Sequence, residues 1–171
     1  MQAWYWTGVA ISFCQTLGLH RNLDLGRRNL SISVRQRSLW RRLWWATFFR
    51  DRWAALALGR PMRINLDDCD AVDPEVEDFL IDTASLTDGI RNDFLPGDQR
   101  ALAKYWVKLI NLSKVLGTVM VMNYQPRRPR PSLQQIEALE SDLMQFGLPD
   151  QPNSRISRLE TSHLRHLHLH Y

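Results

Sequence analysis

The C-terminal stretch of the chain carries a spacing of side chains that could bind a metal ion. His163, His166 and His170 stand at positions i, i+3 and i+7, and His168 lies off that face. Imidazoles at this spacing on one helical face can act as metal ligands. The leucines between them fit a packed helix equally well. We favour that interpretation and predict no metal site.

An acidic cluster and a cysteine are the other residues that could do chemistry. The carboxylates, which superficially resemble a calcium-binding loop, are Asp67, Asp68, Asp70 and Asp73. Such a loop needs glycine at its sixth position and glutamate at its twelfth. Counted from Asp68, neither residue is present at its position. Cys14 and His20 lie on or near one helix without a third group to activate them. The sequence also lacks a G-x-S-x-G, phosphate-loop or dinucleotide motif. We therefore expect no enzyme, no catalytic residues and no bound cofactor in this chain.

Residues 38–61 combine aromatic and basic side chains at unusual density. They contain four tryptophans, two phenylalanines and five arginines. At 100° per residue Trp40, Trp44 and Phe48 share one side of a helix, while Phe49 and Trp53 lie on another. A helix that is apolar nearly all round is usually central in its domain, and arginine stems can cover indole faces. Packing is therefore favoured over contact with nucleic acid. RRPRPS at 127–132 is likewise read as a solvated linker rather than a nucleic-acid patch.

The charges are segregated along the chain. Residues 1–63 contain eleven arginines and two acids, whereas residues 64–100 contain eleven acids and two arginines. The net charge of all 171 residues is only +4. A basic block followed by an acidic block predicts ion pairing within the molecule rather than a nucleic-acid surface.

The pattern of elements is helical throughout. Apolar residues at 6, 9, 10, 13 and 17 predict a helix over 2–20, and Gly59 and Pro61 end a long helix over 34–58. Further helices are predicted over 99–123, over 132–146 with Ser132 and Gln135 as a capping pair, and over 154–171. No alternating strand pattern is present, so the predicted fold class is all-α, an irregular domain of about five helices.

Two segments connect these helices. Residues 64–99 are predicted to be a long, irregular acidic connection punctuated by prolines and glycines. Residues 124–132, YQPRRPRPS, are predicted to be an exposed linker within the domain. The two cysteines, Cys14 and Cys69, indicate reduced thiols rather than a disulfide scaffold. No apolar run approaches the ~20 residues of a membrane span, so no membrane partner is expected.

Two blocks of the sequence resemble a known family. AWYWTGVAISFCQTLGLHRN (3–22) and SLWRRLWWATFFRDRWAALALGRPMRINLDDCDAVDP (38–74) are similar to the middle regulatory domain of fungal zinc-cluster transcription factors. Both blocks occur in the family's order, with a short gap and an acidic continuation, and LRHLHLHY (164–171) loosely resembles the start of a later family helix. Relative to the family, residues 1–171 are expected to form a partial helical regulatory domain, truncated at both ends.

The resemblance implies a set of structural motif residues. They are Gly18, His20, Arg41, Arg42, Trp44, Trp45, Asp51, Arg52, Gly59, Arg60, Pro61, Asp68 and Asp70. It also implies a nuclear protein that controls RNA polymerase II transcription by binding co-regulators or a small-molecule inducer. A homodimer is left open. The alternative is a free-standing helical interaction module without a role linked to DNA.

Zinc and DNA are expected only in a separate domain. The family binds DNA through a cluster of six closely spaced cysteines that bridge two zinc ions. Two cysteines 55 residues apart cannot build it. This chain is therefore expected to show no sequence-specific DNA binding by itself, and no zinc.

Asp51 is the one acidic residue within the aromatic helix. Its neighbours at i±3 and i±4 are Thr47, Phe48, Ala54 and Ala55, none of which can neutralise it. Burying it unpaired would cost several kcal/mol. We therefore expect an arginine from another segment, Arg21 or Arg60, to pair with it; a solvated aspartate is the alternative.

Overall fold

The computed structural model describes residues 2–22, 32–95, 98–125 and 129–145. Within these ranges the regular structure consists of six α-helices and a short 3-10 helix, without a strand, which confirms the all-α prediction. The chain divides into two compact units, Met1–Gly97 and Asp98–Tyr171, which are described separately. The predicted helix over 154–171, with its histidines, lies outside the described residues.

The first unit is organised around α2, Val34–Leu58, whose bounds match the predicted helix. The Ser33 side chain accepts a hydrogen bond from the Gln36 amide and caps the start. Gly59 follows the last turn with φ 60°, a left-handed conformation that only glycine adopts without strain. Pro61 then prevents continuation of the helix. The sequence therefore fixes both ends of α2 by local rules.

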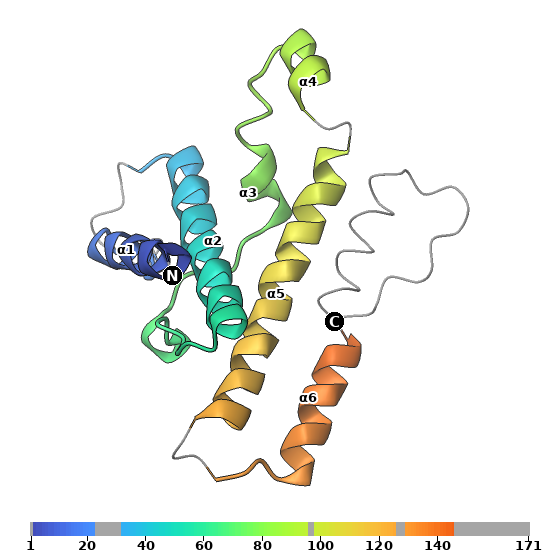
Figure 1. The fold of residues 1–171 in the computed structure, drawn as a ribbon. Helices are drawn as coiled ribbons and strands as arrows, with labels where there is room; N and C mark the ends of the chain where they lie inside the picture. Colours follow the sequence, from blue (N-terminus) through green and yellow to red (C-terminus); the bar gives the residue numbers. More distant parts are fainter. Residues whose placement is uncertain (1, 23–31, 96–97, 126–128, 146–171) are drawn as a thin grey trace. The chain divides into compact units, whose positions relative to one another are not determined.

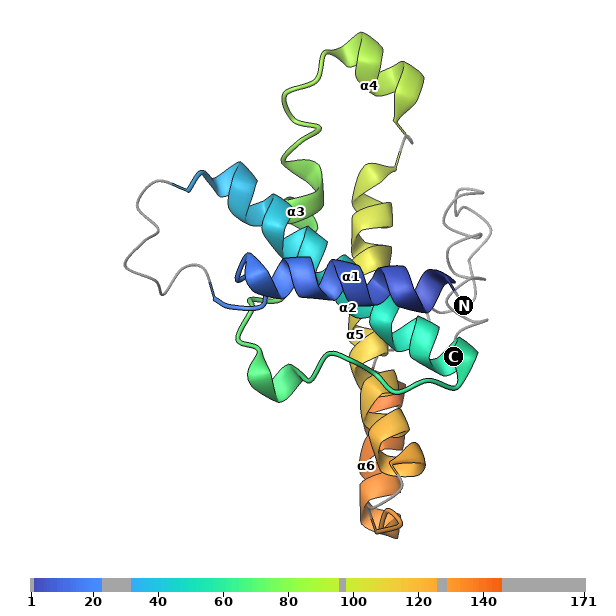
Figure 2. The same cartoon turned by 60° about the vertical axis from the view of Figure 1, so that its left-hand side comes forward.

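Helix α1, Gln2–Thr16, lies across α2 (Figures 1 and 2). It ends earlier than predicted, because Gly18 has φ 74° and turns the chain at residues 17–20. Its buried residues are the apolar Ile11 and the smaller Thr7, Gly8 and Cys14. Gly8 permits a close approach, since a methyl group there would overlap the Arg63 guanidinium. The apolar stripe that predicted the helix, with Trp6, Phe13 and Leu17, is exposed instead.

The acidic segment is more regular than predicted. It contains the 3-10 helix Leu66–Asp68, α3 (Val76–Leu80) and α4 (Asp88–Phe94). Helix α3 packs against α2. Helices of five and seven residues are too short for their periodicity to be recognised in sequence. The prediction of an irregular connection is therefore corrected in these three places.

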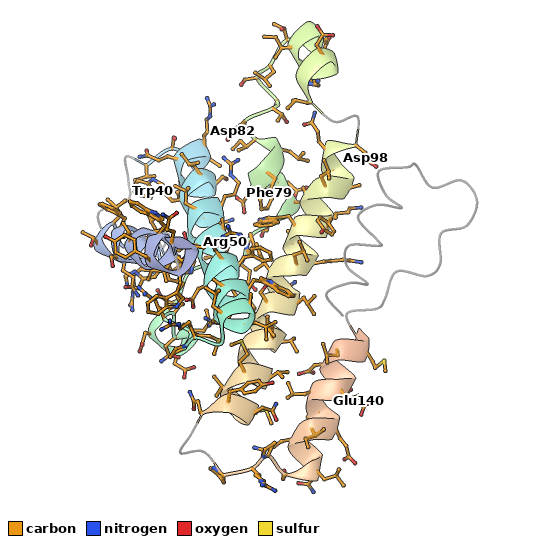
Figure 3. All side chains as sticks on the ribbon, in the orientation of Figure 1. Trp40, Arg50, Phe79, Asp82, Asp98 and Glu140 are labelled. Atoms are coloured by element: carbon orange, nitrogen blue, oxygen red, sulfur yellow. The ribbon has the colours of Figure 1, made fainter. Side chains whose placement is uncertain are left out.

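The predicted pairing of the basic block with the acidic block is present in the first unit. Ion pairs between described residues of the two blocks include Arg21–Asp70, Arg35–Asp82, Arg41–Asp78 and Arg42–Asp82. Figure 3 shows Asp82 close to the N-terminal end of α2. Three arginines of α2, Arg35, Arg41 and Arg42, thus pair with carboxylates from the segment that follows the helix.

The second unit contains α5, Gln99–Tyr124, and α6, Leu133–Gln145, which pack against each other as a hairpin. The Asp98 side chain accepts from the Ala101 amide at the start of α5. Ser132 and Gln135 exchange side-chain-to-backbone hydrogen bonds at the start of α6, as predicted. Of the predicted linker 124–132, residues 126–128 lie outside the described part. The others are exposed except Pro131, which is half-buried.

Candidate functional site

The most deeply buried charges of the described structure are Asp51 and Arg52, adjacent residues in the second half of α2. Their side chains are 1% and 4% exposed. Arg52 Nη1 donates to Asp51 Oδ2 at 2.7 Å, and Arg52 Nη2 donates to the Ile64 carbonyl oxygen at 2.9 Å. The Arg52 guanidinium also lies 4.3 Å from the centre of the Phe48 ring, a cation–π contact. The pair is therefore neutralised within α2 itself.

Backbone amides complete the environment of Asp51. The Arg63 amide donates to both carboxylate oxygens at 3.1 Å, and the Ile64 amide donates to Oδ2 at 3.1 Å. A buried carboxylate is tolerated when its oxygens are bound in this way. Because its oxygens accept bonds from three donor groups, Asp51 is poorly placed to act as a general base. Its role is to hold residues 63–64 against α2.

Asp51 is thus buried and paired, but the predicted partners are wrong. Arg21 forms an ion pair with Asp70, with both side chains largely exposed. The Arg60 guanidinium lies 5.6 Å from the centre of the Trp4 ring. The prediction considered side chains at the helical spacings i±3 and i±4. These spacings do not include Arg52 at i+1, nor the backbone amides of residues 63–64, which lie outside a helix.

Arg63 connects the same segment to α1. While its amide binds Asp51, its guanidinium lies 3.5 Å from the centre of the Trp4 ring and covers Gly8. One residue therefore joins α1 to α2. The sequence signal that could have indicated this contact is a glycine in the middle of an otherwise regular helix, which often marks a close approach.

Burial affects the ionisation of Arg52. Desolvation lowers the pKa of its guanidinium below the ordinary value, and the adjacent Asp51 carboxylate opposes that shift. A guanidinium keeps its charge at neutral pH because its ordinary pKa is so high. The pair is therefore a buried cation and a buried anion. Removing either one leaves the other uncompensated.

Aromatic residues of the motif form the core beside this pair. Trp44 and Trp45 are buried, and Trp45 Nε1 donates to the Val72 carbonyl oxygen at 2.8 Å. The His20 ring lies 5.9 Å from the Trp44 ring, and the His20 carbonyl oxygen accepts from the amides of Asp70 and Ala71. The indoles thus bind the acidic segment and the end of α1 to α2, as the packing interpretation predicted.

The remaining motif residues lie in the same unit but mostly at its surface. Arg41 and Arg42 bind the acidic segment, and Asp68 accepts from the Asn65 side-chain amide at 3.2 Å. Asp70 accepts from the Asn22 amide at 2.8 Å. Gly18 and Gly59 occupy turns, and Pro61 is exposed after α2. The predicted motif residues therefore combine one buried centre with several separate structural contacts.

The two cysteines are free thiols in different environments of the first unit. Cys14 Sγ is buried 3.5 Å from Thr47 Oγ1, and Cys69 Sγ donates to the Asn65 carbonyl oxygen. Burial and the nearby Asp68 carboxylate raise the pKa of the Cys69 thiol, which disfavours the thiolate that zinc requires. No group of three potential ligands is present among the described residues. The carboxylates at 67, 68, 70 and 73 are described residues and are not gathered into such a group.

Comparison with known proteins gives consistent matches. Residues 1–146 match the family model described as fungal specific transcription factor domain. The chain is 31% identical over 139 residues to cutinase transcription factor 1 alpha of Fusarium vanettenii, covering 81% of this chain and 14% of that protein. It is 44% identical over 79 residues to cutinase transcription factor 1 beta of the same fungus, covering 46% and 8%.

A third relative is the acetamidase regulatory protein of Aspergillus fumigatus, 40% identical over 77 residues, which cover 45% of this chain and 10% of that protein. The chain spans about a tenth of the length of these curated relatives. No solved structure gives a significant match. None of the helices in the described ranges is long and apolar enough to cross a membrane.

Proposed function

This chain belongs to the fungal specific transcription factor domain family, and from that premise we propose that it regulates RNA polymerase II transcription in the nucleus. The observation that carries the proposal is the family match over residues 1–146. In this role the chain binds a co-regulator or a small-molecule inducer, while DNA and zinc are bound by a separate domain. The absence of a group of three or more potential metal ligands among the described residues is consistent with this division of roles.

The charge centre of α2 supports a scaffold role. Asp51 and Arg52 hold residues 63–64, and Arg63 extends the connection to α1. A signal received at one of these elements would reach the others through rigid contacts rather than through a mobile loop. Such a scaffold suits a regulatory domain, because the packing of helices has discrete arrangements that a ligand can select.

A tethering experiment tests this function. The whole chain is fused to an unrelated DNA-reading domain in a fungal host and tested on two reporter genes, one silent and one constitutively active. We expect the fusion to change transcription of at least one reporter several-fold relative to the DNA reader alone. Asp51→Ala should weaken the change because it destabilises the fold, whereas Asp82→Asn should retain it.

The proposal fails if a folded, nuclear fusion leaves both reporters at the level of the DNA reader alone. That result would favour an interaction module without a link to transcription. Circular dichroism of the purified chain and imaging of the fusion establish folding and location, so that neither can account for a silent result.

A further inference from the structure

Two arginines gather on one tryptophan where α1 begins and α2 has just ended. The Arg63 guanidinium lies 3.5 Å from the centre of the Trp4 ring, and the Arg60 guanidinium lies 5.6 Å from the same point. Figure 2 shows the first turn of α1 beside the C-terminal end of α2, which brings these segments together. Because both distances are measured to one ring, the two positive charges share one small area.

Within the described residues, neither of these charges is neutralised by a carboxylate. Other arginines of the first unit form ion pairs, namely Arg21, Arg35, Arg41, Arg42, Arg52 and Arg91. Arg60 and Arg63 are both exposed, and their surroundings in the sequence offer no acid, since neither α1 nor residues 53–66 contain one. A local excess of positive charge of this kind attracts anions.

The stacking on Trp4 leaves the hydrogen-bonding edges of both guanidiniums available. A cation–π contact uses the flat face of a guanidinium, whereas its five N–H donors lie in the plane of the group. Among the described residues, Arg60 and Arg63 donate hydrogen bonds only through their backbone amides. Gly8 lets the Arg63 guanidinium lie against α1, which restricts its position. Donors that are held in place before a ligand arrives lower the entropy cost of binding.

Two restrained guanidiniums without a counter-charge suit a doubly charged oxyanion. A phosphate monoester carries a charge of about −1.5 to −2 at pH 7 and has three acceptor oxygens, which guanidiniums bind in a bidentate manner. A carboxylate has a single charge and would neutralise only one of the arginines. We propose that Trp4, Arg60 and Arg63 form a binding site for the phosphate group of a small molecule, with Trp4 orienting the two guanidiniums.

This site deepens the proposed function and rests on it, because it gives the inducer a chemical class, a phosphorylated small molecule. Arg63 connects the site to the rest of the first unit, since its backbone amide binds Asp51 while its side chain binds the ligand. The ligand would therefore stabilise the arrangement of α1 and residues 59–64 that brings both arginines to Trp4.

A nuclear magnetic resonance titration of the whole chain with inorganic phosphate tests the site. With chloride exchanged for phosphate at constant ionic strength and pH, we expect a saturable shift of the Trp4 indole N–H signal, assigned with Trp4→Phe. Arg60→Gln and Arg63→Gln should each weaken binding at least about fivefold, because each removes a charge-assisted contact. Arg50→Gln is the matched control, since it removes an exposed arginine of α2, and it should bind like the parent.

Three results overturn the proposal. The first is a Trp4 signal that shifts no more with phosphate than with chloride. The second is an Arg60→Gln variant that binds phosphate as tightly as the parent, and the third is an Arg50→Gln variant that weakens binding equally, which would indicate a diffuse charge effect. Circular dichroism establishes that each variant is folded. Arg60→Gln decides the test if Arg63→Gln fails to fold, because the Arg60 guanidinium lies farther from the Trp4 ring.

Two further titrations test the class of ligand. Acetate should bind at least about fivefold more weakly than phosphate because it carries one charge, and equal binding would overturn the assignment to phosphate. A short neutral peptide containing phosphoserine should bind no more tightly than phosphoserine alone. Peptide binding that is at least about tenfold tighter would indicate a protein partner and overturn the assignment to a small molecule. These titrations measure binding and the tethered reporters measure transcription, so failure of this site and failure of the proposed function are distinguishable.

Discussion

The two halves of α2 both neutralise arginines with aspartates, but they do so in different environments. In the second half, Asp51 and Arg52 are almost completely buried and belong to the same helix. In the first half, Arg35 and Arg42 meet Asp82 from the acidic segment, where the aspartate side chain is 32% exposed. The same two residue types therefore form a buried centre at one place and a surface cluster at the other.

The difference shows that burial, not pairing alone, decides what an ion pair contributes. A surface pair contributes little because water and salt screen its charges, and because two long side chains must be ordered. A buried pair has lost its hydration, so removing one partner is severely destabilising. At Asp51 the carboxylate also binds backbone amides, and its loss would release a segment of chain as well as a charge.

The largest expected effect is at this buried centre. Asp51→Ala should lower the free energy of unfolding by about 3–5 kcal/mol, because Arg52 would remain buried without its counter-charge. The amides of Arg63 and Ile64 would also lose their acceptor. Urea unfolding of the two proteins, followed by circular dichroism, measures the difference.

The matched control for this variant is the preceding residue. Arg50 is exposed on α2, so Arg50→Ala should change the free energy of unfolding by under ~0.5 kcal/mol (Figure 3). If Asp51→Ala were equally mild, the distinction between the two halves of α2 would not hold.

An intermediate effect is expected at Asp78, which combines features of both halves. Its side chain is 5% exposed, and it accepts from Arg41 Nη1 at 3.0 Å and from the Glu75 amide at 2.8 Å. Arg41 is 20% exposed, so water can partly replace the lost carboxylate. Asp78→Ala should therefore cost about 1–2 kcal/mol. Thermal unfolding should place it between Asp51→Ala and Arg50→Ala, and a cost equal to that of Asp51→Ala would show that Arg41 is not rehydrated.

The long helices were predictable because their ends depend on local chemistry. Gly59 and Pro61 determine where α2 stops, and Ser132 and Gln135 cap α6 through bonds between residues three apart. The family motif likewise identified Asp51 and Arg52 as structural residues. These features could be read from sequence because the interacting residues are close in the chain.

Tertiary contacts were less accessible. The partners of Asp51 include backbone amides twelve and thirteen residues away, and amides carry no sequence signal. On α1 the aromatic residues Trp6 and Phe13 lie on the exposed face, while the buried residues are Ile11 and the smaller Thr7, Gly8 and Cys14. Small residues allow α1 to approach α2 and the Arg63 side chain closely, and this close fit outweighs hydrophobicity in selecting the buried face.

Among the three ion-paired aspartates, the smallest effect is expected at the surface cluster. Asp82→Asn should cost under ~1 kcal/mol at pH 7. Hydrogen bonds from Arg42 and Arg35 lower the pKa of the Asp82 carboxyl below its ordinary value of 3.8. The folded protein therefore binds a proton there less readily than the unfolded chain does, so stability from this group rises with pH across that window. The cost of Asp82→Asn should be constant above about pH 5 and should shrink as the pH falls below about 4.

Two further conditions separate this surface cluster from the buried centre. In about 1 M salt, where the screening length falls to about 3 Å, the cost of Asp82→Asn should shrink, whereas that of Asp51→Ala should persist. Unfolding free energies of the parent and each variant, measured at pH 7, 5 and 3 and at low and high salt, give both comparisons. Asp51 is only 1% exposed, so salt should not screen its charge. If the costs of the two substitutions fell equally in high salt, the distinction between the buried centre and the surface cluster would be wrong. A cost at Asp82 that grew on acidification would reverse the sign derived from its lowered pKa.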